Sequence, residues 1–233
     1  SGVVEVEFGY IDYLLNPSIN LRSGFVLMPV GIYNELHEPP TFYSTRRPEV
    51  EQKIIPSTWR GNGGGIYGSI GENWQYRLFL CESLNVYGTT ANITSAGIRN
   101  GRQSGSAAYA EDFALSGRLD YEWSPGTVLG ASFFNGGIDQ SRLSGVQSSL
   151  LLWDVHGRIK KGPWELRALY ANSSISNADQ LNTFFGFTGS SSIASGQAGW
   201  YVEGAYDILS VLAPGSDDAL FVHGRYEAFN TQA

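Results

Sequence analysis

The chain has 233 residues, of which 16% are charged and 13% aromatic, and its formal net charge at pH 7 is −7. The acidic balance excludes a typical nucleic-acid-binding domain, which carries a basic stripe, and the single cysteine excludes a disulfide scaffold or a cysteine-based zinc site. No apolar run reaches the roughly 18 residues that a transmembrane helix needs.

Apolar and polar residues alternate along ten segments, as expected for strands with one apolar and one polar face. A single helix candidate lies near 47–54. The sequence therefore predicts an all-β fold with antiparallel strands, in one domain over residues 1–233. In chain order, the strand candidates are 3–14, 18–31, 65–70, 74–83, 112–123, 127–135, 149–160, 164–171, 199–208 and 219–229.

The connections between these strands alternate between short and long. Tight turns rich in Gly, Pro and Asn are predicted around Pro17, Gly71, Pro125 and Gly162. A soluble sandwich has no reason to keep this alternation, whereas a transmembrane up-and-down β-barrel has short periplasmic turns and long outer loops. The long loops are predicted at 32–63, 84–111, 136–148 and 173–197.

Two further features favour an apolar face in contact with lipid. Aromatic residues flank three of the short turns and would form one girdle at a membrane interface; they are Trp74, Tyr76, Tyr121, Trp123 and Trp164. Glycines on the apolar faces would leave voids in a packed sandwich core; they are Gly117, Gly130, Gly157 and Gly204. We therefore predict a transmembrane antiparallel up-and-down β-barrel, with about ten strands present and the barrel incomplete.

One part of the chain carries a family resemblance. Residues 21–31 end in Pro29-Val30-Gly31 and run into a long loop, and 199–207 and 224–227 have the pattern of late barrel strands. These segments resemble bacterial outer-membrane porin-type proteins related to the phosphate-selective porin family. The resemblance implies a bacterial outer-membrane location among lipids, passive diffusion of small hydrophilic solutes or ions, no cofactor, and a homo-oligomer, often a trimer.

The chain departs from that family in two respects. The basic residues of the 32–63 loop are balanced by Glu35, Glu38, Glu49 and Glu51, so anion selectivity is not carried over. Such barrels also finish on a strand with a terminal aromatic residue, whereas this sequence finishes at Thr231-Gln232-Ala233. We therefore expect the sequence to be part of a larger barrel.

The 32–63 loop is rich in proline and aromatic residues, which stiffen and anchor a loop. We expect it to fold inward and narrow the lumen; a cap packed on neighbouring loops is the alternative. The candidates for the pore constriction are Arg46, Arg47, Lys53, Arg60, Glu35 and Glu38. By alternation, the candidates for lining the lumen are Glu5, Glu7, Arg22, Arg77, Arg118, Asp120, Asp154, Arg158, Arg167, Glu203 and Arg225. Opposing charges there predict a modest cation preference.

No motif of the chain indicates catalysis. The glycine run 61–65 lacks the lysine and the helix of a phosphate loop, the three histidines lack the spacing of metal ligands, and no Gly-x-Ser-x-Gly elbow is present. We therefore predict a channel that is not an enzyme and uses no metal or cofactor. Two alternatives stay open: a structural or scaffold outer-membrane barrel with a plugged or partner-filled lumen, and a soluble β-sandwich that binds carbohydrate through surface aromatics.

Overall fold

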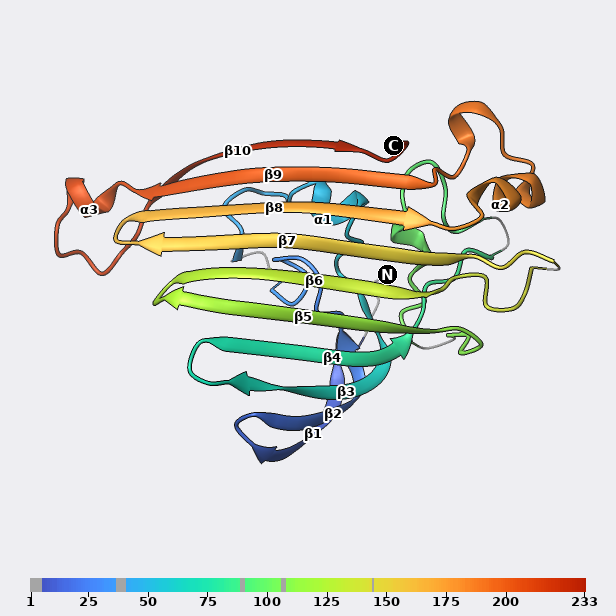
Figure 1. Cartoon of the computed structure of the whole chain (residues 1–233). Helices are drawn as coiled ribbons and strands as arrows, with labels where there is room; N and C mark the ends of the chain where they lie inside the picture. Colours follow the sequence, from blue (N-terminus) through green and yellow to red (C-terminus); the bar gives the residue numbers. More distant parts are fainter. Residues whose placement is uncertain (1–5, 37–40, 89–90, 106–107, 144) are drawn as a thin grey trace.

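The computed structural model of the protein describes residues 6–36, 41–88, 91–105, 108–143 and 145–233. Ten strands form one antiparallel sheet in which each strand pairs with its neighbours in the sequence (Figure 1). In the described residues β1 and β10 are the two edges of this sheet, so the sheet is open and not closed into a barrel. The predicted number of strands and their meander order are confirmed.

Most strand limits lie within three residues of the predicted positions. The predicted start of β1 at residue 3 was wrong, because β1 begins at Gly9, and β2 ends at Leu27 rather than at residue 31 and β8 at Ile175 rather than at residue 171. β3 begins at Arg60, five residues before the prediction, so the glycine run belongs to a strand and the predicted 32–63 loop is in fact 28–59. The strands are β1 (Gly9–Asn16), β2 (Ile19–Leu27), β3 (Arg60–Ile70), β4 (Trp74–Glu82), β5 (Phe113–Ser124), β6 (Thr127–Gly137), β7 (Ser149–Lys161), β8 (Trp164–Ile175), β9 (Gly196–Asp207) and β10 (Phe221–Asn230).

The other three long loops also differ from prediction. The predicted 84–111 loop covers 83–112, because β4 ends and β5 begins one residue inside the predicted limits. The loops predicted at 136–148 and 173–197 are shorter, 138–148 and 176–195, because β6, β8 and β9 extend beyond their predicted ends. The predicted helix near 47–54 is found as the short helix α1 (Val50–Lys53). Two helices inside connections were not predicted: α2 (Ala178–Phe185) follows β8, and α3 (Leu209–Leu212) follows β9.

No helix in the part of the chain that the structure describes is long and apolar enough to cross a membrane.

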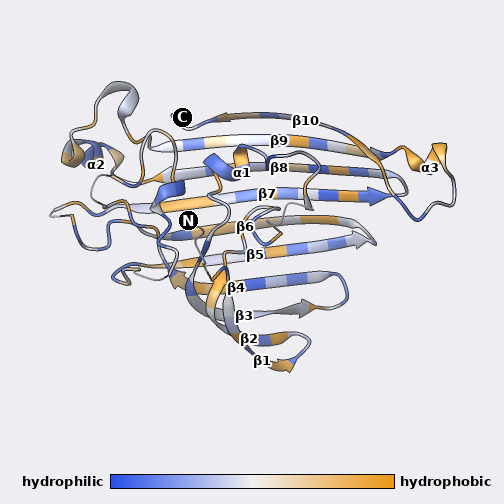
Figure 2. Cartoon of the chain, turned by 180° about the vertical axis from the view of Figure 1, so that it is seen from behind, coloured by the Kyte–Doolittle hydropathy of each residue, from blue (hydrophilic) through white to orange (hydrophobic). Residues whose placement is uncertain are grey.

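The sheet has an inner face, on which the 28–59 loop packs, and an outer face (Figures 1 and 2). Alternate residues of each strand point to opposite faces, so in β7 the side chains of Leu150, Leu152 and Asp154 are buried while those of Leu151 and Trp153 are exposed. The outer face is thus apolar and open to its surroundings, and the inner face is covered.

Apolar side chains from the long loops fill one half of the inner face, nearer the long-loop end of the strands. Trp59 packs on Phe134 of β6 with ring centroids 4.2 Å apart, and Tyr33 stacks on Tyr201 of β9 at 6.5 Å. Together with Phe79 these are the largest fully buried side chains. The hydrophobic core therefore lies between the loops and the sheet, and the 28–59 loop folds inward.

Glycines in β3 allow neighbouring strands to approach closely. A Cβ atom at Gly65 would lie 2.0 Å from the carbonyl oxygen of Leu78, and one at Gly68 would lie 2.2 Å from that of Ser18. Real Cβ atoms essentially never come this close to backbone, so β3 requires glycine at both positions. In Figure 1 the sheet curls most strongly at this end, over β1, β2 and β3.

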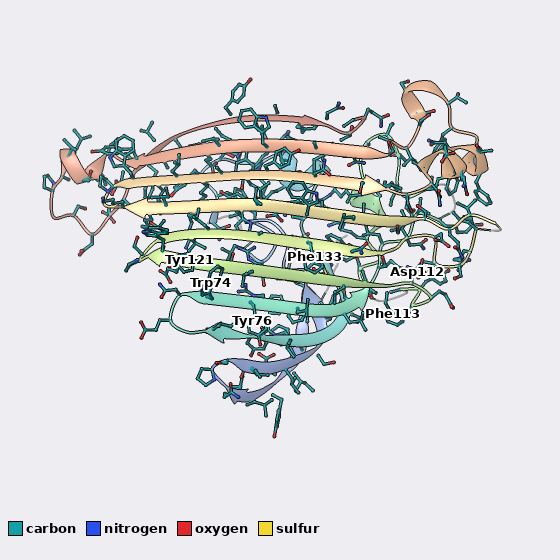
Figure 3. The ribbon with its side chains drawn as sticks, viewed as in Figure 1. Trp74, Tyr76, Asp112, Phe113, Tyr121 and Phe133 are labelled. Atoms are coloured by element: carbon teal, nitrogen blue, oxygen red, sulfur yellow. The ribbon has the colours of Figure 1, made fainter. Side chains whose placement is uncertain are left out.

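Aromatic side chains gather on the outer face beside the short turns. Trp74 of β4 contacts Tyr121 of β5 at 4.7 Å between ring centroids, and Trp164 of β8 contacts Tyr206 of β9 at 4.5 Å. Figure 3 shows Trp74, Tyr76 and Tyr121 together at this end of the sheet. A second group lies further along the strands; it comprises the pairs Trp153–Tyr170 and Trp200–Tyr226, each 5.5 Å apart.

Candidate functional site

The polar half of the inner face, nearer the short turns, carries charged side chains from most strands of the sheet. Strand alternation places nine of the predicted lumen-lining residues there: Arg22, Arg77, Arg118, Asp120, Asp154, Arg158, Arg167, Glu203 and Arg225. Of the other two, Glu5 lies outside the described residues. Glu7 precedes β1, which begins at Gly9, so its prediction as a strand residue was wrong.

Most of these charges form ion pairs with one another. Arg118 lies 2.7 Å from Asp120, Arg167 lies 3.1 Å from Glu165, and Arg225 lies 3.4 Å from Glu203. At the curled end, Arg22 makes two hydrogen bonds of 2.8 Å to Asp12. The opposite charges on the inner face therefore compensate each other within short distances.

A glycine makes one of these contacts possible across a whole strand. Asp120 of β5 and His156 of β7 both pair with Gly130 of β6, and the Asp120 Oδ1 to His156 Nε2 distance is 3.1 Å. A Cβ atom at Gly130 would lie 2.3 Å from the Asp120 oxygen and 2.4 Å from the His156 nitrogen. The prediction that Gly130 lies on the apolar face was wrong. Gly130 faces inward, where the side chains of Asp120 and His156 meet in the space that a Cβ atom would fill.

His156 is also linked, through Asp154, to Gly31 near the start of the 28–59 loop. Its Nδ1 atom lies 2.6 Å from Asp154 Oδ1, and the other oxygen of Asp154 accepts a 3.0 Å hydrogen bond from the Gly31 N–H. The guanidinium of Arg118 donates to the carbonyl oxygen of Gly31. Both backbone groups of Gly31 are thus held by charged side chains of the sheet, which fixes the path of the loop.

A second set of contacts holds the rest of the loop. The Tyr33 hydroxyl donates to Glu203 at 2.7 Å and accepts from Arg167. Glu51 of α1 is completely buried and accepts hydrogen bonds from the Tyr33 N–H at 2.7 Å and from the Tyr201 hydroxyl at 2.5 Å. Burial raises the pKa of Glu51 from its ordinary 4.5 to about 7.

This buried carboxyl group gives folding stability a pH dependence. Between pH 4.5 and about 7 the folded protein holds on Glu51 a proton that the unfolded chain has released, so the contribution of Glu51 to stability is fully present below pH 4.5 and is lost as the pH rises through that window. At about 1.4 kcal/mol per pKa unit the loss is on the order of 3 kcal/mol. We expect Glu51→Gln to flatten this part of the stability curve, measured by denaturant unfolding at several pH values. Glu49→Gln is the control, and an unchanged slope in Glu51→Gln would contradict the prediction.

The predicted constriction residues have different surroundings. Glu35 forms an ion pair with Arg77 of β4 at 3.2 Å. Arg46 is exposed, Arg47 donates to Ser57 at 3.3 Å, and Lys53 ends α1. Arg60 is the first residue of β3, so its placement in the loop was wrong, and Glu38 lies outside the described residues.

Sequence reasoning missed a cationic cluster at the long-loop end. Arg102 donates to the carbonyl oxygen of Thr58 at 2.6 Å, and burial together with the neighbouring Arg99 and Arg60 lowers its pKa to about 10. Arg99 and Arg102 lie in the 83–112 loop, where no periodicity marks a residue's orientation. Tyr33, Glu51 and Tyr201 were missed as well, because a loop anchor depends on contacts between distant segments.

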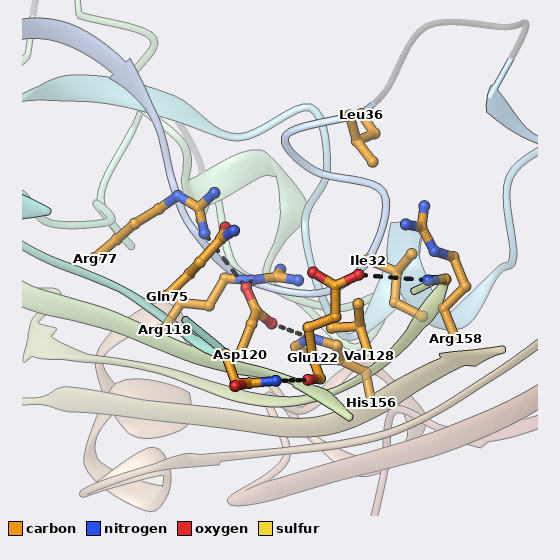
Figure 4. Close-up of a pocket in the computed structure, with 12 residues that line it drawn as sticks. Ile32, Leu36, Gln75, Arg77, Arg118, Asp120, Glu122, Val128, His156 and Arg158 are labelled. Carbon is orange, nitrogen blue, oxygen red and sulfur yellow. Dashed lines mark hydrogen bonds and ion pairs between the residues drawn. The ribbon is translucent and has the colours of Figure 1, made fainter. Parts of the chain in front are cut away.

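A cavity of about 350 Å³ lies on the polar half of the inner face, between the strands and the 28–59 loop (Figure 4). Its floor is formed by β4, β5, β6 and β7, and Ile32 and Leu36 cover it from the loop side. Its charged lining residues are Arg77, Arg118, Asp120, Glu122, His156 and Arg158. Among the described residues, no group of three or more His, Cys, Asp or Glu side chains is arranged to hold a metal ion.

No protein-family model matches the chain, and no solved structure gives a significant match. The chain is similar to an uncharacterized protein of Aquifex aeolicus (strain VF5), with 32% identity over 238 residues that cover 100% of this chain and 53% of the relative. The chain thus spans about half the length of this curated relative.

Proposed function

We propose that the sheet is part of the wall of an outer-membrane β-barrel through which small hydrophilic solutes or ions diffuse passively. The observation that carries this proposal is the outer face. Its large apolar side chains are open to the surroundings, with Trp123 70% exposed, Trp164 63% and Leu80 55%. Burying such a surface is strongly favourable, and lipid is the partner that fits a wide, continuous apolar sheet face. A soluble β-sandwich would instead pack a second layer on this face.

The dimensions of the outer face support the same proposal. In β5 its apolar side chains run from Phe113 to Trp123, which is about 34 Å at ~3.4 Å per residue. With the strand tilt of about 40° found in such barrels, this corresponds to ~25 Å along the membrane normal, the usual height of their apolar band. The aromatic pairs at the short-turn end would then mark one interface.

The edge strands β1 and β10 need pairing partners if the sheet lies in a membrane. In the described part of the chain β1 and β10 each have one neighbouring strand, and in hydrocarbon their unpaired N–H and C=O groups would be very costly. In the proposed barrel these edges are therefore paired with further strands, supplied by the same polypeptide or by another copy. The relative from Aquifex aeolicus has about as much sequence again outside the matched region.

The test is single-channel recording with the folded protein in planar lipid bilayers. We expect discrete ion-conducting openings in potassium chloride. Pure, folded and inserted protein that never conducts would remove the channel proposal. The protein should also require detergent to stay in solution, and monodisperse behaviour without detergent would favour a soluble carbohydrate-binding module.

A second candidate, a barrel with a plugged lumen, is favoured by one observation. The 28–59 loop is fixed to the inner face both by charged side chains and by a continuous apolar core around Trp59 and Phe134. A loop attached so extensively can close the path completely. Bilayer recordings distinguish the two, because a plugged barrel inserts without conducting until the loop is released.

A further inference from the structure

Two charged residues of the cavity in Figure 4 differ from the rest. Arg77, Arg118, Asp120 and His156 form ion pairs with each other or with neighbours. Among the described residues, Glu122 and Arg158 form none within 4 Å. The carboxylate of Glu122 accepts one long hydrogen bond of 3.4 Å, from the Gly126 N–H.

The sheet register holds these two residues at the same height. Glu122 of β5 and Arg158 of β7 both pair with Val128 of β6, so their Cα atoms are two strand spacings, about 10 Å, apart. Figure 4 shows both side chains extending from the sheet into the cavity. A carboxylate and a guanidinium thus flank one apolar residue.

Each group also has a like-charged neighbour on the same face, and that neighbour is already paired with other charges. Asp120 precedes Glu122 by two residues and lies on the same face, and Arg158 pairs directly with Arg167 of β8. Like charges so placed repel each other. A cation beside Glu122 and an anion beside Arg158 would therefore both be stabilised.

The uncharged lining is apolar on one side of these two groups. Val128 lies between Glu122 and Arg158, and Ile32 and Leu36 cover the cavity from the loop, while Asn73 and Gln75 are the polar members of the lining. We propose that this cavity binds an apolar α-amino acid in its zwitterionic form. Its ammonium group contacts Glu122, its carboxylate contacts Arg158, and its side chain packs against Ile32 and Leu36. One part of the inference rests on the proposed channel function, namely that the bound amino acid is a solute which the channel transports.

Isothermal titration calorimetry of the folded protein in detergent tests the site with L-leucine. We expect saturable binding, weakened about tenfold or more for leucinamide, which lacks the carboxylate, and for N-acetyl-leucine, which lacks the ammonium group. Glu122→Gln and Arg158→Gln should each weaken L-leucine binding to the same degree, and Glu72→Gln in the exposed β3–β4 turn is the matched control. Absence of saturable binding, or equal binding of all three compounds, would overturn the inference. This comparison uses the unaltered protein, so it holds even if a variant fails to fold.

Bilayer recordings separate this inference from the proposed function. L-leucine should reduce the potassium chloride current of the unaltered protein and leave that of Glu122→Gln unchanged. A conducting channel that does not bind L-leucine removes the amino-acid site alone. A protein that binds L-leucine but never conducts removes the channel function and leaves a binding site.

Discussion

Replacing Trp59 by alanine should release the 28–59 loop from the inner face and, in the proposed channel, increase the single-channel conductance. Trp59 is almost completely buried and packs on Phe134 of β6, and truncating a buried tryptophan costs about 3–5 kcal/mol. The loop loses its largest apolar contact while the strands keep their hydrogen bonds. The expected result is a folded sheet with a detached loop and a wider path.

Conductance and limited proteolysis measure this effect together. The Trp59→Ala protein should be cut within 28–59 much faster than the unaltered protein, and its channels should pass more current. Trp123→Ala on the outer face is the control and should leave the conductance unchanged. If the unaltered protein does not conduct and Trp59→Ala does, the lumen is plugged by this loop. Equal conductance of both, with equal resistance to proteolysis, would mean that Trp59 does not hold the loop.

Replacing Gly65 by valine should prevent the sheet from forming. The new Cβ atom would lie 2.0 Å from the Leu78 carbonyl oxygen and 2.8 Å from the Phe79 Cα atom. Because both are backbone atoms of the paired strand β4, no side-chain rotation relieves the contact. Overpacking usually costs about 1–3 kcal/mol, and this contact should exceed that range because it separates two paired strands.

The control for this variant is Gly204→Val in β9. A Cβ atom there meets its nearest neighbour, a flexible side-chain atom of Leu166, at 3.8 Å. Far-UV circular dichroism and resistance to trypsin after refolding should show native sheet for Gly204→Val and its loss for Gly65→Val. Native spectra for both variants would show that β3 can move away from β4 at little cost.

The strands could be predicted because their alternation is local. In β7, Trp153 and Asp154 reveal their opposite faces through their own side chains, and the turns around Gly71 and Gly162 carry residues that favour a reversal. The start of β3 could not be placed in this way. Its first residues include four glycines, which have no side chain to mark a face, so the alternation became visible five residues late.

The loop anchors could not be predicted in the same way. Gly130 has no side chain to mark its face, and its position becomes clear from a hydrogen bond between two other strands, in which His156 donates to Asp120. Glu51 looked like one of several loop charges, whereas its burial depends on Tyr201, 150 residues further along the chain. The free charges Glu122 and Arg158 likewise become distinct once the pairing of β5, β6 and β7 is known.

The meander order of the sheet constrains the sequence of events in folding. Strand pairs join segments that are close in the chain, so hairpins such as β7–β8 can form as soon as they are synthesised. The 28–59 loop is different, because Gly31 binds Asp154 and Tyr33 binds Glu203, 123 and 170 residues later. Trp59 can pack on Phe134 only once β6 is in place, and Tyr33 and Glu51 gain their partners Glu203 and Tyr201 only with β9. The nascent polypeptide therefore exposes the apolar residues of the 28–59 loop during much of its synthesis. A chaperone that covers residues 28–59 would protect the chain from aggregation during that time.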